Sequence, residues 1–269
     1  MKDKKEAKQT DWEIKMEKLS ETDIHAGTMA FYQMFIREKK SIKILDIGAG
    51  SGKVAMGLAS LPQVNEIIAY DKSLELMREL KSSDKIRKVT DGSYKKLPFD
   101  DESFDIAVCR YVFHHMENKD RALAEINRIL VDNGTFFLSD PILPQHSKQA
   151  LNAIYRIRED SFHGYCDYHE MIDLLEKNRF TPILIRPYHH GYKNLNEYSK
   201  AIGDNIDAAE YEDKPSAKDS TVSVLKGKIV RAINAVDETV RKEMKMTGSG
   251  IGLSFRYYIV DIASIKQGA

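Results

Sequence analysis

The stretch that most constrains this 269-residue chain is KILDIGAGSGKVAMGLA, residues 43–59. The apolar run Ile42–Ile47 predicts a buried strand, three alternating glycines follow it, and Val54–Leu61 predicts a helix. Glycine lets the backbone turn tightly and approach a ligand closely. A strand, a glycine turn and a helix in this order predict one unit of a parallel sheet that is covered by helices.

Strand and helix patterns keep alternating as far as Pro141, which predicts an α/β fold with a doubly wound, mostly parallel sheet. The further strands predicted in this part are Glu66–Tyr70, Phe104–Cys109 and Thr135–Ser139. The predicted helices are residues 24–39, Leu74–Leu80 and Ala122–Leu130, the last of which is stopped by Asn133-Gly134. Later in the chain we expect a helix at Tyr168–Asn178, a strand at Pro182–Arg186, and one or two strands within Ile251–Ile265.

We expect one domain over residues 1–269, since no repeat or low-complexity linker divides the chain. Its expected parts are N-terminal helices (1–39), a cofactor-binding core (40–141), a helical cap (142–166 and 190–246), and segments that complete the sheet (167–189 and 247–269).

Spacing distinguishes the glycine loop from two other loops of similar composition. A phosphate-binding GxxxxGK[ST] loop would need glycine where Ile47 stands and Ser or Thr where Val54 stands. A dinucleotide-binding GxGxxG loop would need glycine at Lys53. The loop therefore fits neither pattern.

The loop fits the pattern acidic-x-Gly-x-Gly-x-Gly, which resembles motif I of class I S-adenosylmethionine-dependent methyltransferases. IIAYDKSLELM then places Asp71 at the end of the second predicted strand. DGSYKKLPFDDESFDIAVCRYVFHH (91–115) resembles the GDAxxLPFxDxSFDxV block of methyltransferases similar to those of ubiquinone and menaquinone biosynthesis, and AEINRILVDNGTFFLSD (124–140) resembles the block that follows it. The resemblance covers about residues 44–141 and implies a Rossmann-like, seven-stranded sheet, here with an inserted helical cap.

The resemblance implies S-adenosylmethionine as the cofactor and S-adenosylhomocysteine as its product, and it assigns a role to each matching position. The residues implied for the glycine loop are Asp46, Gly48, Ala49, Gly50 and Gly52; Asp71 would bind the ribose, with Lys72 and Met77 near the adenine. Ser93, after Gly92, replaces the aspartate that the family uses for adenine, so contact from Ser93 and Tyr94 is expected without a charge. Arg110 would lie where the third predicted strand ends.

Tyr111, His114 and His115 are the candidate catalytic residues, because they follow that strand on the side where the resemblance places the substrate. Imidazole can accept a proton near neutral pH, and we expect one of the two histidines to do so, with Tyr111 positioning the substrate. The alternative is that the histidines are hydrogen-bonded structural residues. The cluster SFHGYCDYHE, residues 161–170, either lines a substrate pocket or packs the cap, and we expect no metal site.

Composition restricts the expected partners and location. Lys plus Arg and Asp plus Glu each total 41, and this zero net charge gives no support for nucleic-acid binding. No apolar run approaches the roughly 20 residues of a membrane span, and the charged start has no signal-peptide pattern. We therefore expect a cytoplasmic monomer or homodimer that does not bind membranes.

The expected function is transfer of the cofactor's methyl group, by in-line displacement, to a small-molecule, peptide or natural-product acceptor. One alternative is a protein of the same fold that binds the cofactor without transferring methyl and acts as a scaffold or regulator. Another is a nucleotide-dependent oxidoreductase, which Lys53 disfavours at the third glycine of the fingerprint.

Overall fold

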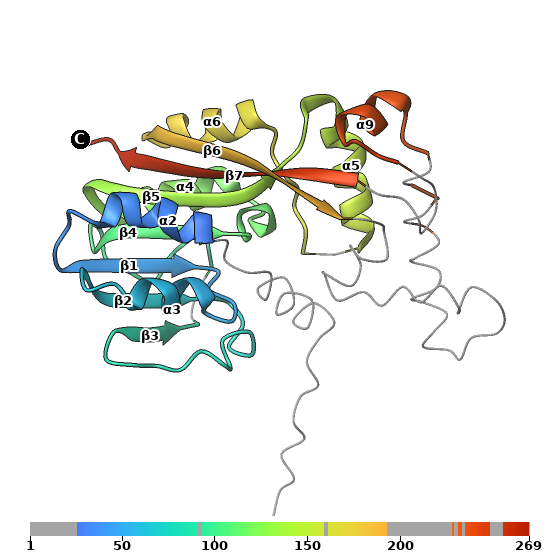
Figure 1. Ribbon diagram of the computed structural model, residues 1–269. Helices are drawn as coiled ribbons and strands as arrows, with labels where there is room; N and C mark the ends of the chain where they lie inside the picture. The colour runs from blue at the N-terminus through green and yellow to red at the C-terminus, as the bar shows by residue number, and fades with distance from the viewer. Residues whose placement is uncertain are drawn as a thin grey trace, which may run out of the picture.

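The centre of the molecule is a seven-stranded sheet in the order β3-β2-β1-β4-β5-β7-β6 (Figure 1). This computed structural model describes residues 26–90, 93–158, 161–192, 228, 231–232, 235–247 and 255–268. The strands are β1 (Ile42–Ile47), β2 (Val64–Tyr70), β3 (Ile86–Val89), β4 (Phe104–Arg110), β5 (Leu130–Ile142), β6 (Phe180–Tyr192) and β7 (Phe255–Lys266). Only β7 runs antiparallel to its neighbours, β5 and β6, among the strands described. The predicted fold class is confirmed.

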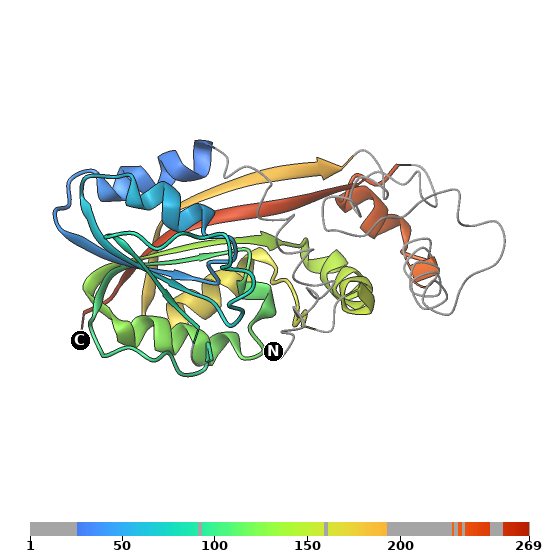
Figure 2. The same cartoon turned by 90° about the horizontal axis from the view of Figure 1, so that it is seen from below.

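Helices cover both faces of the sheet (Figure 2). Helices α2 (Ala26–Ile36) and α3 (Lys53–Ala59) lie on one face, and α4 (Lys119–Ile129) and α6 (Tyr168–Lys177) lie on the other. Alternate residues of a strand point to opposite faces, so Ile44 packs into the α2 and α3 side of the core and Leu45 packs into the opposite side. The near-continuous apolar runs of the central strands follow from this burial on both faces.

The winding of the chain creates a crevice between β1 and β4. From β1 the chain moves outward through β2 to β3 and then returns to β4 on the other side of β1. The connections at the carboxyl ends of β1 and β4 therefore leave in opposite directions. Sheets of this kind bind their ligands at such a point. The loop from Gly48 to Gly52 and Arg110, the last residue of β4, both lie there.

The helix expected at Leu74–Leu80 is wrong, because the structure has turns there. Two apolar residues of this segment, Met77 and Leu80, are nevertheless buried in the core. The backbone of this segment does not form the hydrogen bonds of an α-helix. Lys88 Nζ donates to Met77 O, and Arg78 N donates to Glu75 O, three residues earlier. The following strand, β3, was not expected, since its sequence IRKV has only two apolar residues.

The stop signal expected for α4 is also wrong. The helix ends at Ile129, four residues before Asn133, and Leu130 already has extended backbone. Asn133 has a φ of 59°, and a Cβ on Gly134 would lie 2.7 Å from Val131 O. This pair therefore turns the chain at the start of β5, where only glycine fits the second position.

The described part of the expected cap consists of α5 (Gln145–Arg158) and α9 (Glu238–Glu243), beyond the carboxyl end of β5 (Figure 1). Side chains of His146 and Ser147 contact the carboxylate of Glu243 and join the two helices. Much of residues 190–246, and residues 1–25 of the expected N-terminal helical segment, lie outside the described residues. No helix of the described ranges is long and apolar enough to cross a membrane.

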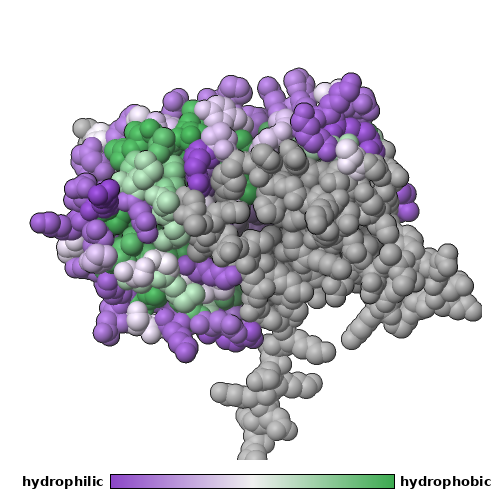
Figure 3. Space-filling model, in the orientation of Figure 1, coloured by the Kyte–Doolittle hydropathy of each residue, from purple (hydrophilic) through white to green (hydrophobic). Residues whose placement is uncertain are grey.

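The surface in the orientation of Figure 1 shows apolar areas among hydrophilic side chains (Figure 3). The large apolar side chains that stay exposed include Met34 of α2, Met56 of α3, and Ile183 and Leu184 of β6. Most of the apolar side chains of the described strands are buried instead, and the sheet therefore carries the core.

Candidate functional site

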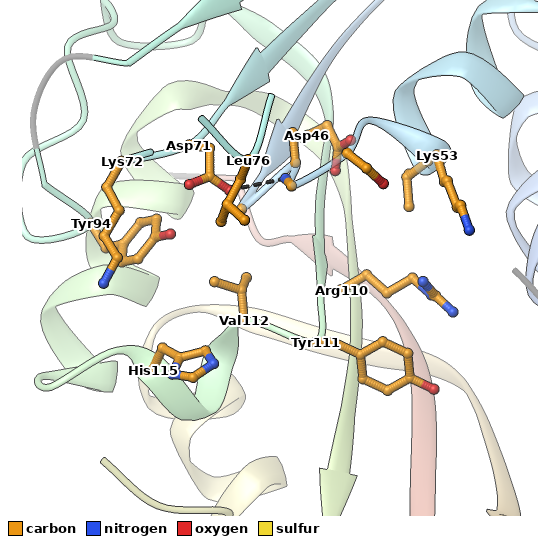
Figure 4. A pocket seen from close by; sticks show the side chains of 15 residues that line it. Asp46, Lys53, Asp71, Lys72, Leu76, Tyr94, Arg110, Tyr111, Val112 and His115 are labelled. Atoms are coloured by element: carbon orange, nitrogen blue, oxygen red, sulfur yellow. Dashed lines mark hydrogen bonds between the residues drawn. The ribbon is translucent and has the colours of Figure 1, made fainter. Parts of the chain in front are cut away.

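A pocket opens at the crevice between β1 and β4 (Figure 4). It holds about 690 Å³ of space between side chains, including its open mouth. The residues that line it are Asp46, Gly48, Ala49, Gly50, Ser51, Lys53, Val54, Asp71, Lys72, Leu76, Tyr94, Arg110, Tyr111, Val112 and His115. The pocket therefore joins the glycine loop, the ends of β2 and β4, and the short 3-10 helix η1 (Phe113–His115).

The glycine loop is held against β2 by its backbone. The N–H groups of Gly48 and Ala49 both donate to Tyr70 O, at 2.8 and 3.1 Å. Gly48 has a φ of 70°, and a Cβ on it would lie 2.6 Å from the side chain of Val112. Gly50 has a φ of 50° and nothing within 4 Å of such a Cβ. One glycine is thus required by close packing, and the other faces the open pocket.

Asp71 braces the loop from the end of β2. Its Oδ2 accepts a 2.9 Å hydrogen bond from Gly50 N, the dashed line in Figure 4, and its Oδ1 accepts one from Ser73 N at 2.9 Å. Burial raises the pKa of Asp71, and these backbone hydrogen bonds oppose the rise. The backbone of Lys72 also lowers this pKa through a hydrogen bond, so a carboxylate with about four acceptor positions keeps about one for a hydroxyl group of a ligand.

Asp46 lies at the base of the same loop and is almost completely buried. Its Oδ2 accepts a hydrogen bond from Ala55 N, 3.1 Å away in α3. Burial raises the pKa of Asp46 from 3.8 to about 7; the Ala55 hydrogen bond opposes this rise and the charge of Asp71 adds to it. Asp46 therefore changes its charge near neutral pH.

Replacing Asp46 by asparagine should remove part of the pH dependence of stability. The folded protein keeps a proton on Asp46 between pH 4 and pH 7 that the unfolded chain loses, so wild-type stability from this group falls as pH rises through that window. Relative to wild type, the free energy of unfolding of the variant should rise by an amount on the order of a few kcal/mol from pH 4 to pH 8. Urea unfolding at several pH values measures this difference. The same substitution at the exposed Asp100 is the control; an equal pH dependence in wild type and Asp46→Asn would contradict the prediction.

Arg110 and Tyr111 form the β4 side of the pocket. The guanidinium of Arg110 lies 4.4 Å from the centre of the Tyr111 ring, and its side chain is largely buried. Its Nε is buried and has no hydrogen-bond partner among the described residues, and its guanidinium brings a positive charge to the pocket lining that can attract an anionic group of a ligand. Tyr111 has a φ of 54°, a strained conformation for a side chain of this size. Such strain tends to occur at functional sites.

The two histidines differ in position. His115 lines the pocket, and its Nδ1 lies 3.2 Å from Ser161 O. His114 does not line the pocket; its Nδ1 is 2.9 Å from Oδ1 of the buried Asp140. The ring centres of the two histidines are 4.1 Å apart. The sequence offered no signal for Asp140 beyond its place at the end of a predicted strand.

The structure brings together most of the residues expected at the cofactor site. It does not place Met77, Gly52 or Ser93 in the pocket lining. Met77 is buried in the core, and a Cβ on Gly52 would overlap Leu80, so Gly52 is needed for packing. The expected residues that do line the pocket are Asp46, Gly48, Ala49, Gly50, Asp71, Lys72, Tyr94, Arg110, Tyr111 and His115.

Gly92 lies outside the described residues, and so do the side chains of His189 and His190. Sequence reasoning missed five lining residues: Ser51, Lys53, Val54, Leu76 and Val112. Leu76 takes the position expected for Met77, one residue away, since the segment is a turn whose side-chain directions a helical pattern does not predict. The cluster at 161–170 packs the cap: Phe162 and Cys166 are buried and are absent from the pocket lining. No group of metal-binding side chains occurs within the described ranges.

The pocket fits the cofactor that the sequence resemblance implies. Asp71 has acceptor capacity left for a ribose hydroxyl, and Gly50 leaves open space beside it. Arg110 supplies a cation for the carboxylate of the methionine part. Leu76 and Tyr94 supply apolar surface beside Asp71 for the adenine. The donors, acceptors and apolar groups therefore match those of S-adenosylmethionine.

Comparison with known proteins agrees with this chemistry. Residues 45–138 match the family model described as a methyltransferase domain. Over 126 residues the chain is 36% identical to an uncharacterized methyltransferase, YcgJ, of Bacillus subtilis, which covers 44% of this chain and 49% of the relative. It is 27% identical over 105 residues to a demethylmenaquinone methyltransferase of Chlorobaculum tepidum, with 39% and 43% covered. A sarcosine/dimethylglycine N-methyltransferase of Aphanothece halophytica is 28% identical over 141 residues, with 49% and 50% covered.

Solved structures extend the likeness to the fold of the whole molecule. The crystal structure of YcgJ from Bacillus subtilis superimposes with a TM-score of 0.73 at 23% identity, covering 91% of this chain and 100% of that one. A putative methyltransferase from Bacillus halodurans gives a TM-score of 0.74 at 20% identity, covering 90% and 100%. The matched segments span about half the length of the curated relatives. The predicted resemblance to methyltransferases is confirmed for the segment that carries the glycine loop and the pocket.

Proposed function

We propose that this chain, whose residues 45–138 match the family model of a methyltransferase domain, transfers the methyl group of S-adenosylmethionine to a small-molecule, peptide or natural-product acceptor. The observation that carries the proposal is the brace between Asp71 and Gly50 at the point where the winding of the sheet reverses. This brace places a carboxylate with acceptor capacity left beside an open glycine, as a ribose requires. A protein of similar fold, a phosphoethanolamine N-methyltransferase of Haemonchus contortus, has been solved in complex with S-adenosyl-L-methionine.

When bound, the cofactor supplies a methyl group on a sulfonium sulfur, which makes that methyl electrophilic without a metal. The residues of this chain then have to hold the acceptor in line with it. Asp71 would hold the ribose and Arg110 the carboxylate, with Lys72, Leu76 and Tyr94 at the adenine. His115 and Tyr111, at the mouth beyond β4, would face the acceptor. Asp46 would fix the loop through Ala55 N.

The acceptor is proposed to be recognised by the shape of a pocket. The chain has no net charge, so it offers no broad field for a polyanion. The named acceptors of the relatives, demethylmenaquinone and sarcosine or dimethylglycine, are small molecules of different polarity. These acceptors support a small-molecule acceptor for this chain, and they do not agree on the atom that receives the methyl group.

Two measurements test the proposed function. Calorimetry should show binding of S-adenosylmethionine and S-adenosylhomocysteine, and no binding of NAD. Radiolabelled methyl should then pass from S-adenosylmethionine to one member of a panel of small acceptors. Binding without transfer to any acceptor would favour the scaffold alternative, and tight NAD binding without S-adenosylmethionine binding would contradict the proposal.

A further inference from the structure

Lys53 has no role in the proposed function, although it lines the pocket. It is the first residue of α3 and is half-buried. No ion pair or side-chain hydrogen bond joins Lys53 to another residue within the described ranges. The protein itself therefore supplies no anion for this ammonium group, which is left for a group that enters the pocket.

Helix stability does not explain a lysine at this position. The N-terminus of a helix carries a partial positive charge, which disfavours a cation in the first turn. The first turn of α3 contains no acidic residue that would offset the charge of Lys53. An uncharged side chain of similar length would suit the helix at least as well, so the charge at this position has another cause.

Arg110 brings a second cation to the same pocket. It is 9% exposed, and it contacts the ring of Tyr111 without pairing with any carboxylate of the part of the chain that the structure describes. A buried charge without a partner is unfavourable. The carboxylates of the pocket accept backbone N–H groups instead, two at Asp71 and one at Asp46. An anion for the two cations would therefore come from a ligand.

The polar groups of the pocket are separated in space (Figure 4). Asp71 and Tyr94 lie at one side, and Lys53 and Arg110 lie at the other. A ligand that fills the pocket would thus present a hydroxyl group at one end and an anion at the other. S-adenosylmethionine has this order of groups, because its amino-acid chain leads from the ribose through the sulfur to the carboxylate.

We propose, on the basis of the proposed function, that Lys53 binds the carboxylate of the cofactor together with Arg110. Lys53 is then a specificity-determining residue, since its charge favours adenosyl compounds that carry the carboxylate over those that lack it. The lysine that departs from the dinucleotide-binding pattern of glycines thereby has a positive role in this pocket.

The test compares two ligands that differ only in this carboxylate: S-adenosylhomocysteine and its decarboxylated form, which keeps the adenosine, the sulfur and the ammonium group. Calorimetry on the full chain should show that Lys53→Met weakens binding of S-adenosylhomocysteine about tenfold, the lower end for a hydrogen bond to a charged group, because Lys53 is half-buried. Affinity for the decarboxylated form should stay nearly unchanged. Lys53→Arg, which keeps the charge, should bind S-adenosylhomocysteine nearly as well as wild type.

The matched control is Lys81→Met, which makes the same change of charge at an exposed lysine outside the pocket lining and should alter neither affinity. Thermal unfolding without ligand should show that Lys53→Met is at least as stable as wild type. Unchanged affinity of Lys53→Met for S-adenosylhomocysteine, or an equal loss for both ligands, would overturn the assignment of Lys53 alone. A wild-type protein that does not bind S-adenosylhomocysteine would overturn the proposed function, and the assignment with it.

Discussion

Replacing Asp71 by asparagine should weaken binding of S-adenosylhomocysteine about a hundredfold. The substitution removes the charge that strengthens two backbone hydrogen bonds, from Gly50 N and Ser73 N, and it removes acceptor capacity for the ribose. Hydrogen bonds to a charged group contribute about 1.5–3 kcal/mol each, and tenfold in affinity corresponds to about 1.4 kcal/mol. A hundredfold loss of affinity therefore corresponds to about 2.8 kcal/mol, the contribution of one or two such hydrogen bonds. Isothermal calorimetry measures it.

The control for this prediction is Glu79→Gln, which removes an exposed carboxylate from the segment that follows Asp71. Its affinity for S-adenosylhomocysteine should equal that of wild type. Circular dichroism and thermal unfolding show whether Asp71→Asn is folded. A folded Asp71→Asn protein with wild-type affinity would mean that the ribose is bound elsewhere and would remove the main support for the proposed function.

The sequence was enough to predict the central strands and their layers. Runs such as Ile42–Ile47 are mostly apolar, because β1 is buried on both faces. It was not enough for Leu74–Leu80 or for β3. At Leu74–Leu80, hydrogen bonds to Lys88 and Glu75 outweigh the helical pattern of apolar residues. At β3, pairing with β2 outweighs the polar character of the sequence.

The site was predictable where backbone position alone decides it. The carboxyl ends of parallel strands meet at one edge, so Asp71 and Arg110 could be expected there together. Which of two adjacent side chains faces the pocket depends on the turn that carries them. The 3-10 turn of η1 therefore separated His115 from His114, and the turn after Asp71 placed Leu76 instead of Met77 in the lining. Asp140 acquires its partner only through a contact 26 residues away in sequence.

The glycines of the loop make different contributions, and this difference gives the second large effect. Gly48→Ala should lower the free energy of unfolding by about 2–5 kcal/mol. Its φ of 70° costs an L-residue about 1–2 kcal/mol, and the new Cβ would lie 2.6 Å from Val112 Cβ, an overlap that costs about 1–3 kcal/mol more. Since Val112 Cβ is not the end of a flexible side chain, the loop itself would have to shift, and the hydrogen bond from Gly50 N to Asp71 would be disturbed. Urea unfolding and S-adenosylhomocysteine calorimetry should therefore both change.

Gly50→Ala is the matched control, because it has a φ of 50° but no atom within 4 Å of the added Cβ. We expect it to cost only about 1–2 kcal/mol of stability, from the backbone alone, and yet to weaken ligand binding, since its methyl group enters the open pocket beside Asp71. In a double-mutant cycle, Val112→Gly should relieve part of the Gly48→Ala cost, by more than about 1 kcal/mol. Equal costs for the two alanine substitutions, with no coupling to Val112, would show that close packing does not explain glycine at position 48.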